Sequence, residues 1–242
     1  METSFSTLFC EIFHKNQLDR FCTEEIISKF EKLTLILMEE NAHTNLTAIR
    51  ELPDIIAKHY ADSLLAVDLF PENATVIDIG CGGGFPTFPL AIARPDLKIT
   101  AVDSTQKKIN FVQKASDLLN LTNITPICAR AEEASMQKHR EHFQIATSRA
   151  MARMNILTEL ALPFVTIGGQ LIALKGAQGS NEAAEAHNAA AKLGGEPQIQ
   201  DIATSLETTT TSESRHILVI NKKSASPKQY PRAYGAISKK PL

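Results

Sequence analysis

The feature that most constrains the fold of this chain is a short apolar segment that runs directly into a cluster of glycines. Residues 75–79 read TVIDI, a β-branched run typical of a strand buried on both faces, and residues 80–84 read GCGGG. Glycine lets the backbone adopt left-handed conformations and pass close to a ligand. A strand followed by such a loop is typical of α/β folds that bind ligands at the carboxyl ends of parallel strands.

The spacing of the glycines argues against a dinucleotide cofactor. The dinucleotide-binding fingerprint G-x-G-x-x-G needs a third glycine or alanine, and Phe85 and Thr87 occupy that position in the two possible registers. The observed pattern is G-x-G-x-G over residues 80–84, with Asp78 near the end of the preceding strand. This pattern favours a ligand without a pyrophosphate. An NAD-dependent dehydrogenase is therefore the function that the glycine pattern supports least.

S-adenosylmethionine fits the pattern because it carries an amino acid, a sulfonium cation and a ribose. An acidic side chain near the loop then attracts the ligand. Asp103 ends the second predicted strand, 23 residues after Gly80, where a carboxylate accepts the ribose hydroxyls in related dinucleotide folds. Glu132 and Arg149 follow the third and fourth strands at the same edge of the sheet. These residues predict an S-adenosylmethionine site built on Asp78, Gly80, Gly82, Gly84 and Asp103.

The rest of the chain predicts a mostly parallel sheet of seven strands, preceded by helices. Six further short apolar runs predict strands at residues 98–102, 124–128, 143–147, 170–174, 198–205 and 215–220. Helical patterns between the first five give repeated strand–helix–strand units, whereas the last two strands have no helix between them and predict an antiparallel hairpin. We expect an exposed connection over residues 207–214 in this hairpin.

Three regions are predicted from this pattern. Residues 1–70 form a helical N-terminal extension packed on the core, residues 71–223 form the Rossmann-like domain, and residues 224–242 form a basic tail. The net charge is −2, but residues 215–242 hold seven basic and no acidic side chains, so the first 214 residues carry −9. The tail is rich in proline and lysine, and we expect it to be extended, poorly ordered without a partner and able to contact a polyanion.

Several classes of protein are disfavoured by the sequence. The four cysteines are scattered with no C-x-x-C pair, which predicts neither a metal site nor a disulfide framework. Residues 1–18 lack a basic segment and contain acidic residues, so they do not resemble a signal peptide. No apolar run approaches the roughly 20 residues of a membrane helix. We therefore expect a cytoplasmic protein without a membrane partner, and no feature demands more than a monomer.

An S-adenosylmethionine site favours a methyltransferase, and the segment after the fourth strand limits which kind of atom can receive the methyl group. Enzymes that methylate exocyclic amines usually place an Asn/Asp-Pro-Pro-aromatic loop there, and this chain reads TSRA at residues 147–150. Methylation at pyrimidine C5 needs a cysteine nucleophile, usually after Pro or Thr, and none of the cysteines has that neighbour. A ring nitrogen such as guanine N7 carries a free lone pair and no proton. In-line transfer to N7 then depends on alignment and needs no general base, so none is assigned.

Taken together, the segments resemble the RsmG (GidB) family of bacterial 16S rRNA guanine-N7 methyltransferases over nearly the whole chain. The matching segments lie at residues 45–50, 59–63, 78–91, 103–108, 130–133, 148–150, 173–176, 215–216 and 228–242. Two positions depart from the family pattern. Thr87 stands where the family usually has glycine, and residues 234–238 replace part of the usual tail.

The resemblance implies the class I S-adenosylmethionine-dependent methyltransferase fold, and 16S rRNA of the small ribosomal subunit as substrate. It implies that the cofactor is contacted by Gly80, Phe85, Ala131, Glu132 and Arg149, the last with a possible positioning role in catalysis. It implies that the RNA is contacted by Arg130, Lys175 and Arg215, and the basic tail adds Lys228 and Arg232.

Alternatives remain open at the level of sequence. A small-molecule methyltransferase, or a noncatalytic module that binds nucleotides or RNA, would share the fold. His59 and Asp62, three residues apart, are most simply explained as a hydrogen-bonded pair on one helix.

Overall fold

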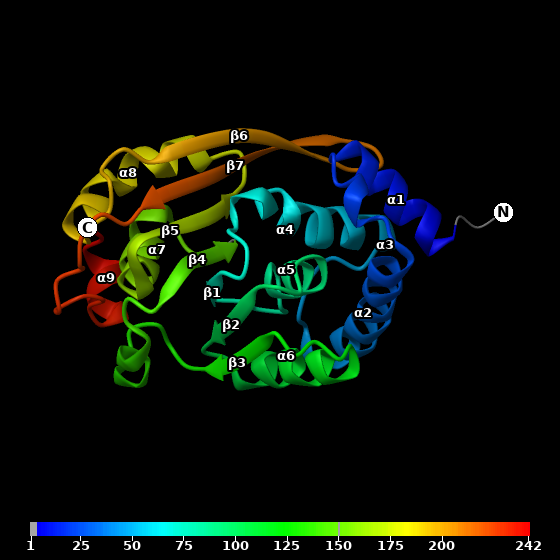
Figure 1. Ribbon diagram of the computed structural model, residues 1–242, viewed down its shortest axis with the longest axis horizontal. Helices are drawn as coiled ribbons and strands as arrows, with labels where there is room; N and C mark the ends of the chain where they lie inside the picture. The colour runs from blue at the N-terminus through cyan, green and yellow to red at the C-terminus, as the bar shows by residue number, and fades with distance from the viewer. Residues whose placement is uncertain (1–3, 150) are drawn as a thin grey trace.

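A single seven-stranded sheet forms the centre of the molecule in the computed structural model, which describes residues 4–149 and 151–242 (Figure 1). The spatial order is β3-β2-β1-β4-β5-β7-β6. Strands β1 to β5 pair in parallel, and β7 runs antiparallel to both β5 and β6. The predicted α/β sheet with a terminal hairpin is confirmed. The strands are β1 (Thr75–Ile79), β2 (Lys98–Asp103), β3 (Ile124–Cys128), β4 (Phe143–Arg149), β5 (Val165–Lys175), β6 (Gln200–Glu207) and β7 (Ser212–Asn221).

Helical segments cover both faces of this sheet (Figure 1). Those before β1 are α1 (Phe5–Lys15), η1 (Asp19–Phe21), α2 (Glu24–Thr44), α3 (Leu52–Asp54), the π-helical η2 (Ile55–Ala61), α4 (Asp62–Leu64) and η3 (Val67–Leu69). Those after β1 are α5 (Thr87–Ala93), α6 (Gln106–Leu118), η4 (Ala134–His139), α7 (Met154–Ala161), η5 (Leu162–Phe164), α8 (Gly179–Lys192) and α9 (Tyr234–Lys239).

The central strands are apolar throughout because each of their faces packs against a different set of helices. Val76 and Ile172 belong to an apolar cluster with α2, α5 and α6, whereas their neighbours Ile77 and Leu171 belong to a second cluster with α7 and α8. Successive side chains of a strand point to opposite faces, so each strand serves both clusters. The two clusters fix the sheet between its helices and hold the carboxyl ends of β1 to β5 along one edge.

The N-terminal helices share the first apolar cluster with the sheet. Thr23 caps the start of α2 by accepting a hydrogen bond from the Ile26 amide, and Asn45 ends it in the left-handed conformation. Beyond α1, the Asn16 side chain exchanges two hydrogen bonds with the backbone of Glu207 at the tip of the β6–β7 hairpin. The helices therefore contact both the core and the hairpin.

Two expectations about the C-terminal part are wrong. The hairpin strands extend through Glu207 and from Ser212, because their Thr, Ser and Glu side chains pair across exposed strands and do not end them. The tail was expected to be extended and poorly ordered, but it is packed against the rest of the chain. The Arg140 guanidinium donates to the carbonyls of Ser226, Pro227 and Tyr230, and the tail ends in α9, which packs on α7.

Candidate active site

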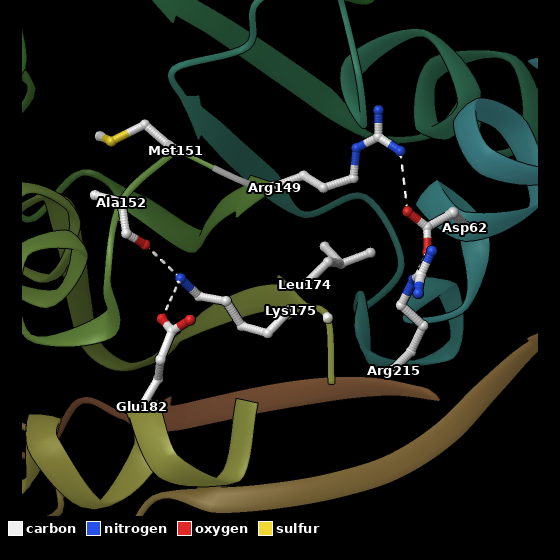
Figure 2. Close-up of a pocket in the computed structure, with 9 residues that line it drawn as sticks. Asp62, Arg149, Met151, Ala152, Leu174, Lys175, Glu182 and Arg215 are labelled. Carbon is white, nitrogen blue, oxygen red and sulfur yellow. Dashed lines mark hydrogen bonds and ion pairs between the residues drawn. The ribbon is translucent and has the colours of Figure 1, made fainter. Parts of the chain in front are cut away.

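Two cavities lie along the carboxyl edge of the sheet and share Met151 as a common wall. The first, the β2–β3 cleft, has a volume of about 300 Å³. The second, the β4–β5 cleft, has a volume of about 450 Å³ and is drawn in Figure 2. The β2–β3 cleft is lined by Ile79, Gly80, Val102, Asp103, Ser104, Thr105, Lys108, Ala129, Arg130, Ala131, Glu132, Met151, Leu160 and Tyr234. The β4–β5 cleft is lined by Asp62, Arg149, Met151, Ala152, Leu174, Lys175, Gly176, Glu182 and Arg215.

The three glycines of the loop after β1 have different tasks. Gly80 lines the β2–β3 cleft with φ +75°, and a Cβ there would lie 2.5 Å from Cγ of Met151. Gly82, with φ +57°, donates its amide to the carboxylate of Asp103 at 3.1 Å. Gly84, with φ +86°, leaves room for the ring of Phe88, which a Cβ would approach to 2.2 Å. Only Gly80 borders the cleft, while the other two shape the loop.

Asp103 presents its carboxylate to the β2–β3 cleft at the end of β2. The two oxygens accept hydrogen bonds from the amides of Gly82 at 3.1 Å and Thr105 at 2.8 Å, and the Lys108 ammonium lies 3.8 Å away. A carboxylate has about four acceptor positions, so the two amides leave capacity for two hydroxyl donors. The backbone thus holds an acceptor of the kind that a ribose diol requires.

The remaining lining of the β2–β3 cleft fits an adenosine that carries a positive charge. Ala129, Ala131 and Leu160 offer apolar surface to a flat ring. Asp103 and Glu132 balance the cationic Lys108 and Arg130, so the cleft is not a site with excess positive charge for a pyrophosphate. The donor set therefore suits S-adenosylmethionine.

Asp78 lies below this cleft and does not line it. The side chain is fully buried, and one oxygen accepts a hydrogen bond from the Thr87 hydroxyl at 2.6 Å. The other oxygen has no partner among the described residues. Burial raises the pKa of Asp78 to about 7, against the smaller opposing effect of the Thr87 hydroxyl. Thr87, the departure from the family pattern, thus serves as the donor that this carboxyl group requires.

Replacing Asp78 with asparagine is expected to flatten the pH dependence of stability. The pKa near 7 in the folded chain lies above the ordinary 3.8 of an aspartate, so between about pH 4 and 7 the folded state binds the extra proton. The contribution of Asp78 to the free energy of unfolding is therefore fully present below about pH 4 and is lost as the pH rises towards 7. The variant should gain on the wild type by up to about 4 kcal/mol over this range, at about 1.4 kcal/mol per pH unit. Urea unfolding of the ligand-free proteins at several pH values measures the difference, and parallel curves would contradict it.

Arg149 ends β4 and is enclosed by groups from the N-terminal helices. Its guanidinium donates to the Lys58 carbonyl, to Asp62 Oδ2 at 3.0 Å and to His59 Nδ1 at 3.0 Å. It also lies 5.5 Å from the ring centre of Phe85. The side chain lines the β4–β5 cleft, not the β2–β3 cleft.

His59 and Asp62 do not pair with each other, because both are turned to the same arginine. Since arginine only donates, His59 accepts at Nδ1 and carries its proton on Nε2, which lies 2.8 Å from the Thr47 hydroxyl. Burial and the nearby Arg149 charge lower the pKa of His59 to about 3, so the ring is neutral. It stacks on Phe85 at 4.3 Å, which makes Phe85 a support for this cluster and not part of the β2–β3 cleft wall. The expected His59–Asp62 pair is wrong.

The other basic residues of the β4–β5 cleft are also paired with acids (Figure 2). Arg215 Nε donates to Asp62 Oδ1 at 2.6 Å, on the carboxylate oxygen opposite the one that Arg149 contacts. Lys175 lies 2.8 Å from Glu182 and donates to the Ala152 carbonyl. Three cations and two carboxylates therefore line one cleft, and Arg215 also donates to Glu213 Oε2 at 2.9 Å, so each cation of the cleft is paired with a carboxylate.

The remaining residues expected to contact RNA are distributed differently. Arg130 lines the β2–β3 cleft, and its guanidinium lies 5.6 Å from the ring centre of Tyr234. Arg232 binds the carboxylate of Glu159, a fully buried residue of α7. Lys228 is exposed and makes no ion pair within the described chain. Ala150, in the segment that follows β4, lies outside the described residues.

Sequence reasoning missed three residues that shape these clefts. Met151 separates them, Glu182 pairs with Lys175, and Tyr234 from the tail closes one side of the β2–β3 cleft. The matched motifs gave no signal for Met151 or Glu182, and Tyr234 falls where the tail departs from the family pattern.

Within residues 4–149 and 151–242, no three or more His, Cys, Asp or Glu side chains are grouped to hold a metal ion. None of the helices in the described part of the chain combines the length and hydropathy that crossing a membrane would require.

Comparison with known proteins gives one family. Residues 26–213 match the family model for rRNA small subunit methyltransferase G, also called GidB. A ribosomal RNA small subunit methyltransferase G from Leuconostoc mesenteroides is 41% identical over 225 residues, covering 91% of this chain and 92% of the relative. The protein of the same name from Lactiplantibacillus plantarum is 44% identical over 226 residues and covers 91% of each chain.

Solved structures resemble the chain more distantly. YcgJ from Bacillus subtilis has a TM-score of 0.54 at 12% identity, over 69% of this chain and all of its own. A precorrin-6y C5,15-methyltransferase from Geobacter metallireducens has a TM-score of 0.52 at 13% identity, over 74% of this chain and 92% of its own. At such identities the likeness concerns the fold alone.

Proposed function

The chain belongs to the rRNA small subunit methyltransferase G family, and from this membership we propose that it methylates N7 of one guanine in 16S rRNA of the small ribosomal subunit. It has the class I S-adenosylmethionine-dependent methyltransferase fold and is an enzyme that uses this cofactor. The observation that best supports the proposal is the pair of clefts that meet at Met151. One suits the cofactor, and the other, with a volume of about 450 Å³ and three basic side chains in its lining, is large enough for a nucleotide.

In the proposed site, the β2–β3 cleft holds the cofactor. Asp103 accepts the ribose hydroxyls, Gly80 lets the loop come close, and Ala131 and Glu132 form the far wall. When bound there, S-adenosylmethionine supplies a methyl group made electrophilic by its sulfonium. Arg149, Asp78 and Phe85 act from outside this cleft, as supports of the loop and of the neighbouring cleft.

The guanine is proposed to enter the β4–β5 cleft, where its N7 faces the shared wall. Guanine N7 has a free lone pair and loses no proton, so the chain needs to supply alignment and not a base. The imidazole that contacts Arg149 fits that requirement, since the pKa of His59 is lowered to about 3 and its Nδ1 accepts a hydrogen bond from Arg149. Positioning of this kind can contribute about 7–11 kcal/mol to a barrier. Lys175 and Arg215 are the proposed anchors for the nucleotide.

The RNA must present an accessible base. The major groove of an A-form helix is too deep and narrow for side chains, so the target guanine must lie in a loop or be turned out of the stack. The exposed Lys228 is proposed to contact phosphate. Because one chain contributes both clefts, the proposal takes the enzyme as a monomer, working in the cytoplasm where its substrate is found.

The division of the chain is part of the proposal. The helical extension (1–70) supplies Asp62 to the β4–β5 cleft and His59 as a support of Arg149. The methyltransferase domain (71–223) supplies most of the lining of both clefts, and the tail (224–242) supplies Tyr234 to the β2–β3 cleft. The extension is therefore expected to be necessary for substrate binding as well as for folding.

The proposal is tested by labelling. Purified protein is incubated with radiolabelled S-adenosylmethionine and either small ribosomal subunits or free 16S rRNA, both from a strain that lacks this activity. The RNA is digested and the labelled nucleoside identified. We expect label in 7-methylguanosine at one site, and strongly reduced labelling with the Asp103→Ala variant when the cofactor is kept well below saturation for that variant.

The other outcomes separate the alternatives. Label in a different nucleoside would keep the fold and cofactor and overturn the N7 assignment. Label only in small molecules would favour a small-molecule methyltransferase. Binding of the cofactor without transfer to any acceptor would favour a noncatalytic RNA-binding module.

A further inference from the structure

We propose that Tyr234, at the start of α9 in the C-terminal tail, belongs to the cofactor site and packs its ring against the adenine of S-adenosylmethionine. The inference rests on the assignment of the β2–β3 cleft to the cofactor made above. It gives the tail a task in cofactor binding that is separate from any contact with RNA.

The tail is held firmly enough to present a side chain to the cleft. Arg232 binds Glu159 of α7 through its backbone amide at 3.0 Å and through its guanidinium. Two residues later Tyr234 begins α9, and Ile237 of this helix is fully buried in the second apolar cluster. Anchors on both sides of Tyr234 therefore fix the backbone that carries its ring.

The segment after β3 and the tail also contact each other directly. Arg140 lies just after η4 and donates to three carbonyls of the tail, and Arg130 lies over the Tyr234 ring at 5.6 Å from its centre. Arg130 in turn lies 3.4 Å from Glu132. The cleft wall that follows β3 is thus a joint surface of two segments about 100 residues apart.

The position of Tyr234 corresponds to the base end of the cleft. Asp103 at the end of β2 marks the ribose, and the glycine loop after β1 lies on one side of it. The base must then extend to the other side, towards the loop after β3, where Arg130 and Tyr234 lie.

The ring has both the chemistry and the free surface that this task needs. Tyr234 is the one aromatic side chain among the described residues that line the cleft. It remains 41% exposed although its helix is anchored, so ring surface is still available to a ligand. Stacking of an aromatic side chain on a nucleobase is favourable for any base. Arg130, expected from the resemblance to meet RNA, is assigned here to hold this ring.

The test compares ligand binding by three variants with the wild type. Tyr234→Ala removes the ring, Tyr234→Phe keeps it without the hydroxyl, and Lys239→Ala alters an exposed residue of the same helix. Isothermal titration calorimetry measures the affinity for S-adenosylhomocysteine, and for methylthioadenosine, which retains the adenosine but lacks the amino acid. Thermal melting of the ligand-free proteins reports on folding.

We expect Tyr234→Ala to bind both ligands about tenfold more weakly, a typical loss for one stacked base. Tyr234→Phe and Lys239→Ala should stay within about twofold of the wild type, and all melting temperatures should agree. In steady-state assays the alanine variant should raise KM for the cofactor about tenfold and leave kcat unchanged.

Three results would overturn the inference. They are equal affinities for Tyr234→Ala and wild type, a loss for Tyr234→Phe as large as for alanine, and a loss confined to S-adenosylhomocysteine. The last would place the ring at the amino-acid end of the ligand. Failure of the wild type to bind either ligand would instead overturn the assignment of the cleft itself.

Discussion

Replacing Asp103 with alanine will weaken the binding of S-adenosylmethionine by about 100-fold or more. The carboxylate is the acceptor that we propose for the ribose in the β2–β3 cleft, and it retains capacity for two hydroxyl donors. Hydrogen bonds to a charged group contribute about 1.5–3 kcal/mol each, so two of them amount to about 3 kcal/mol or more, and each 1.4 kcal/mol is tenfold in affinity. Calorimetric titration with the cofactor measures the loss directly.

The loss has a second component inside the chain. The amides of Gly82 and Thr105 both donate to this carboxylate, so alanine also removes the group that fixes the glycine loop. Asp103→Asn keeps one acceptor oxygen and the size of the side chain, and should lose less affinity than alanine. Asp117→Ala, on the exposed side of α6, serves as the surface control and should bind as the wild type does. An alanine variant that binds within threefold of the wild type would remove Asp103 from the site.

Strands β1 to β4 were predictable because each is short, largely apolar and bounded by polar or turn residues. Besides the hairpin strands, β5 was predicted only in part, because it begins at Val165 and not at Gln170. Gly168 and Gly169 hide its first half, since glycine in a strand usually indicates a turn. Here Gly169 is required by a close approach, because a Cβ would lie 2.3 Å from the Gln144 carbonyl, and the pairing with β4 shifts register at that point. This close contact between the backbones of β5 and β4 depends on the neighbouring strand, so the sequence around Gly169 alone does not reveal it.

The residues that line the clefts were predictable from the chain's own pattern where a strand end fixes them, and otherwise only through the resemblance to the family. Gly80 and Asp103 follow β1 and end β2, so the fold itself carries them to the same edge. Asp62 joins Arg149 and Arg215 across 87 and 153 residues of sequence, through a π-helical segment that no periodicity revealed. Ion pairs of this kind form where distant helices and strands pack against each other. The types and spacing of residues in the sequence do not show which elements these will be.

The tail shows the limit of reasoning from composition. Its prolines and lysines are typical of a disordered, polyanion-binding segment. The tail is nevertheless ordered because three of its residues are held by the core. Arg232 binds the buried Glu159, Ile237 packs within the second apolar cluster, and Ser226 accepts a hydrogen bond from the buried Lys222. Charge counted along the sequence therefore overstates the charge available to RNA at this end of the molecule.

Replacing Arg232 with alanine will lower the free energy of unfolding by about 3–5 kcal/mol. Glu159 is fully buried, and the Arg232 guanidinium is its ion-pair partner, binding both carboxylate oxygens. Breaking a buried pair from one side leaves an uncompensated charge in the core, which typically costs this much. For a chain of this size, 1 kcal/mol corresponds to about 2–4 °C in melting temperature, so a fall of about 10 °C is expected by differential scanning calorimetry.

Two control variants separate this structural task from RNA binding. In Arg232→Met/Glu159→Leu the buried charge is removed together with its partner, so most of the lost stability should return. Lys228→Ala alters an exposed tail lysine and should leave the melting temperature unchanged, while lowering the salt dependence of RNA binding by about one phosphate contact. If Arg232→Ala melted like the wild type and lowered only the salt dependence, Arg232 would be a phosphate contact after all. With the tail anchored through Arg232, the RNA contacts that we propose for it would fall to the exposed lysines, on a backbone that the buried carboxylate of Glu159 holds in place.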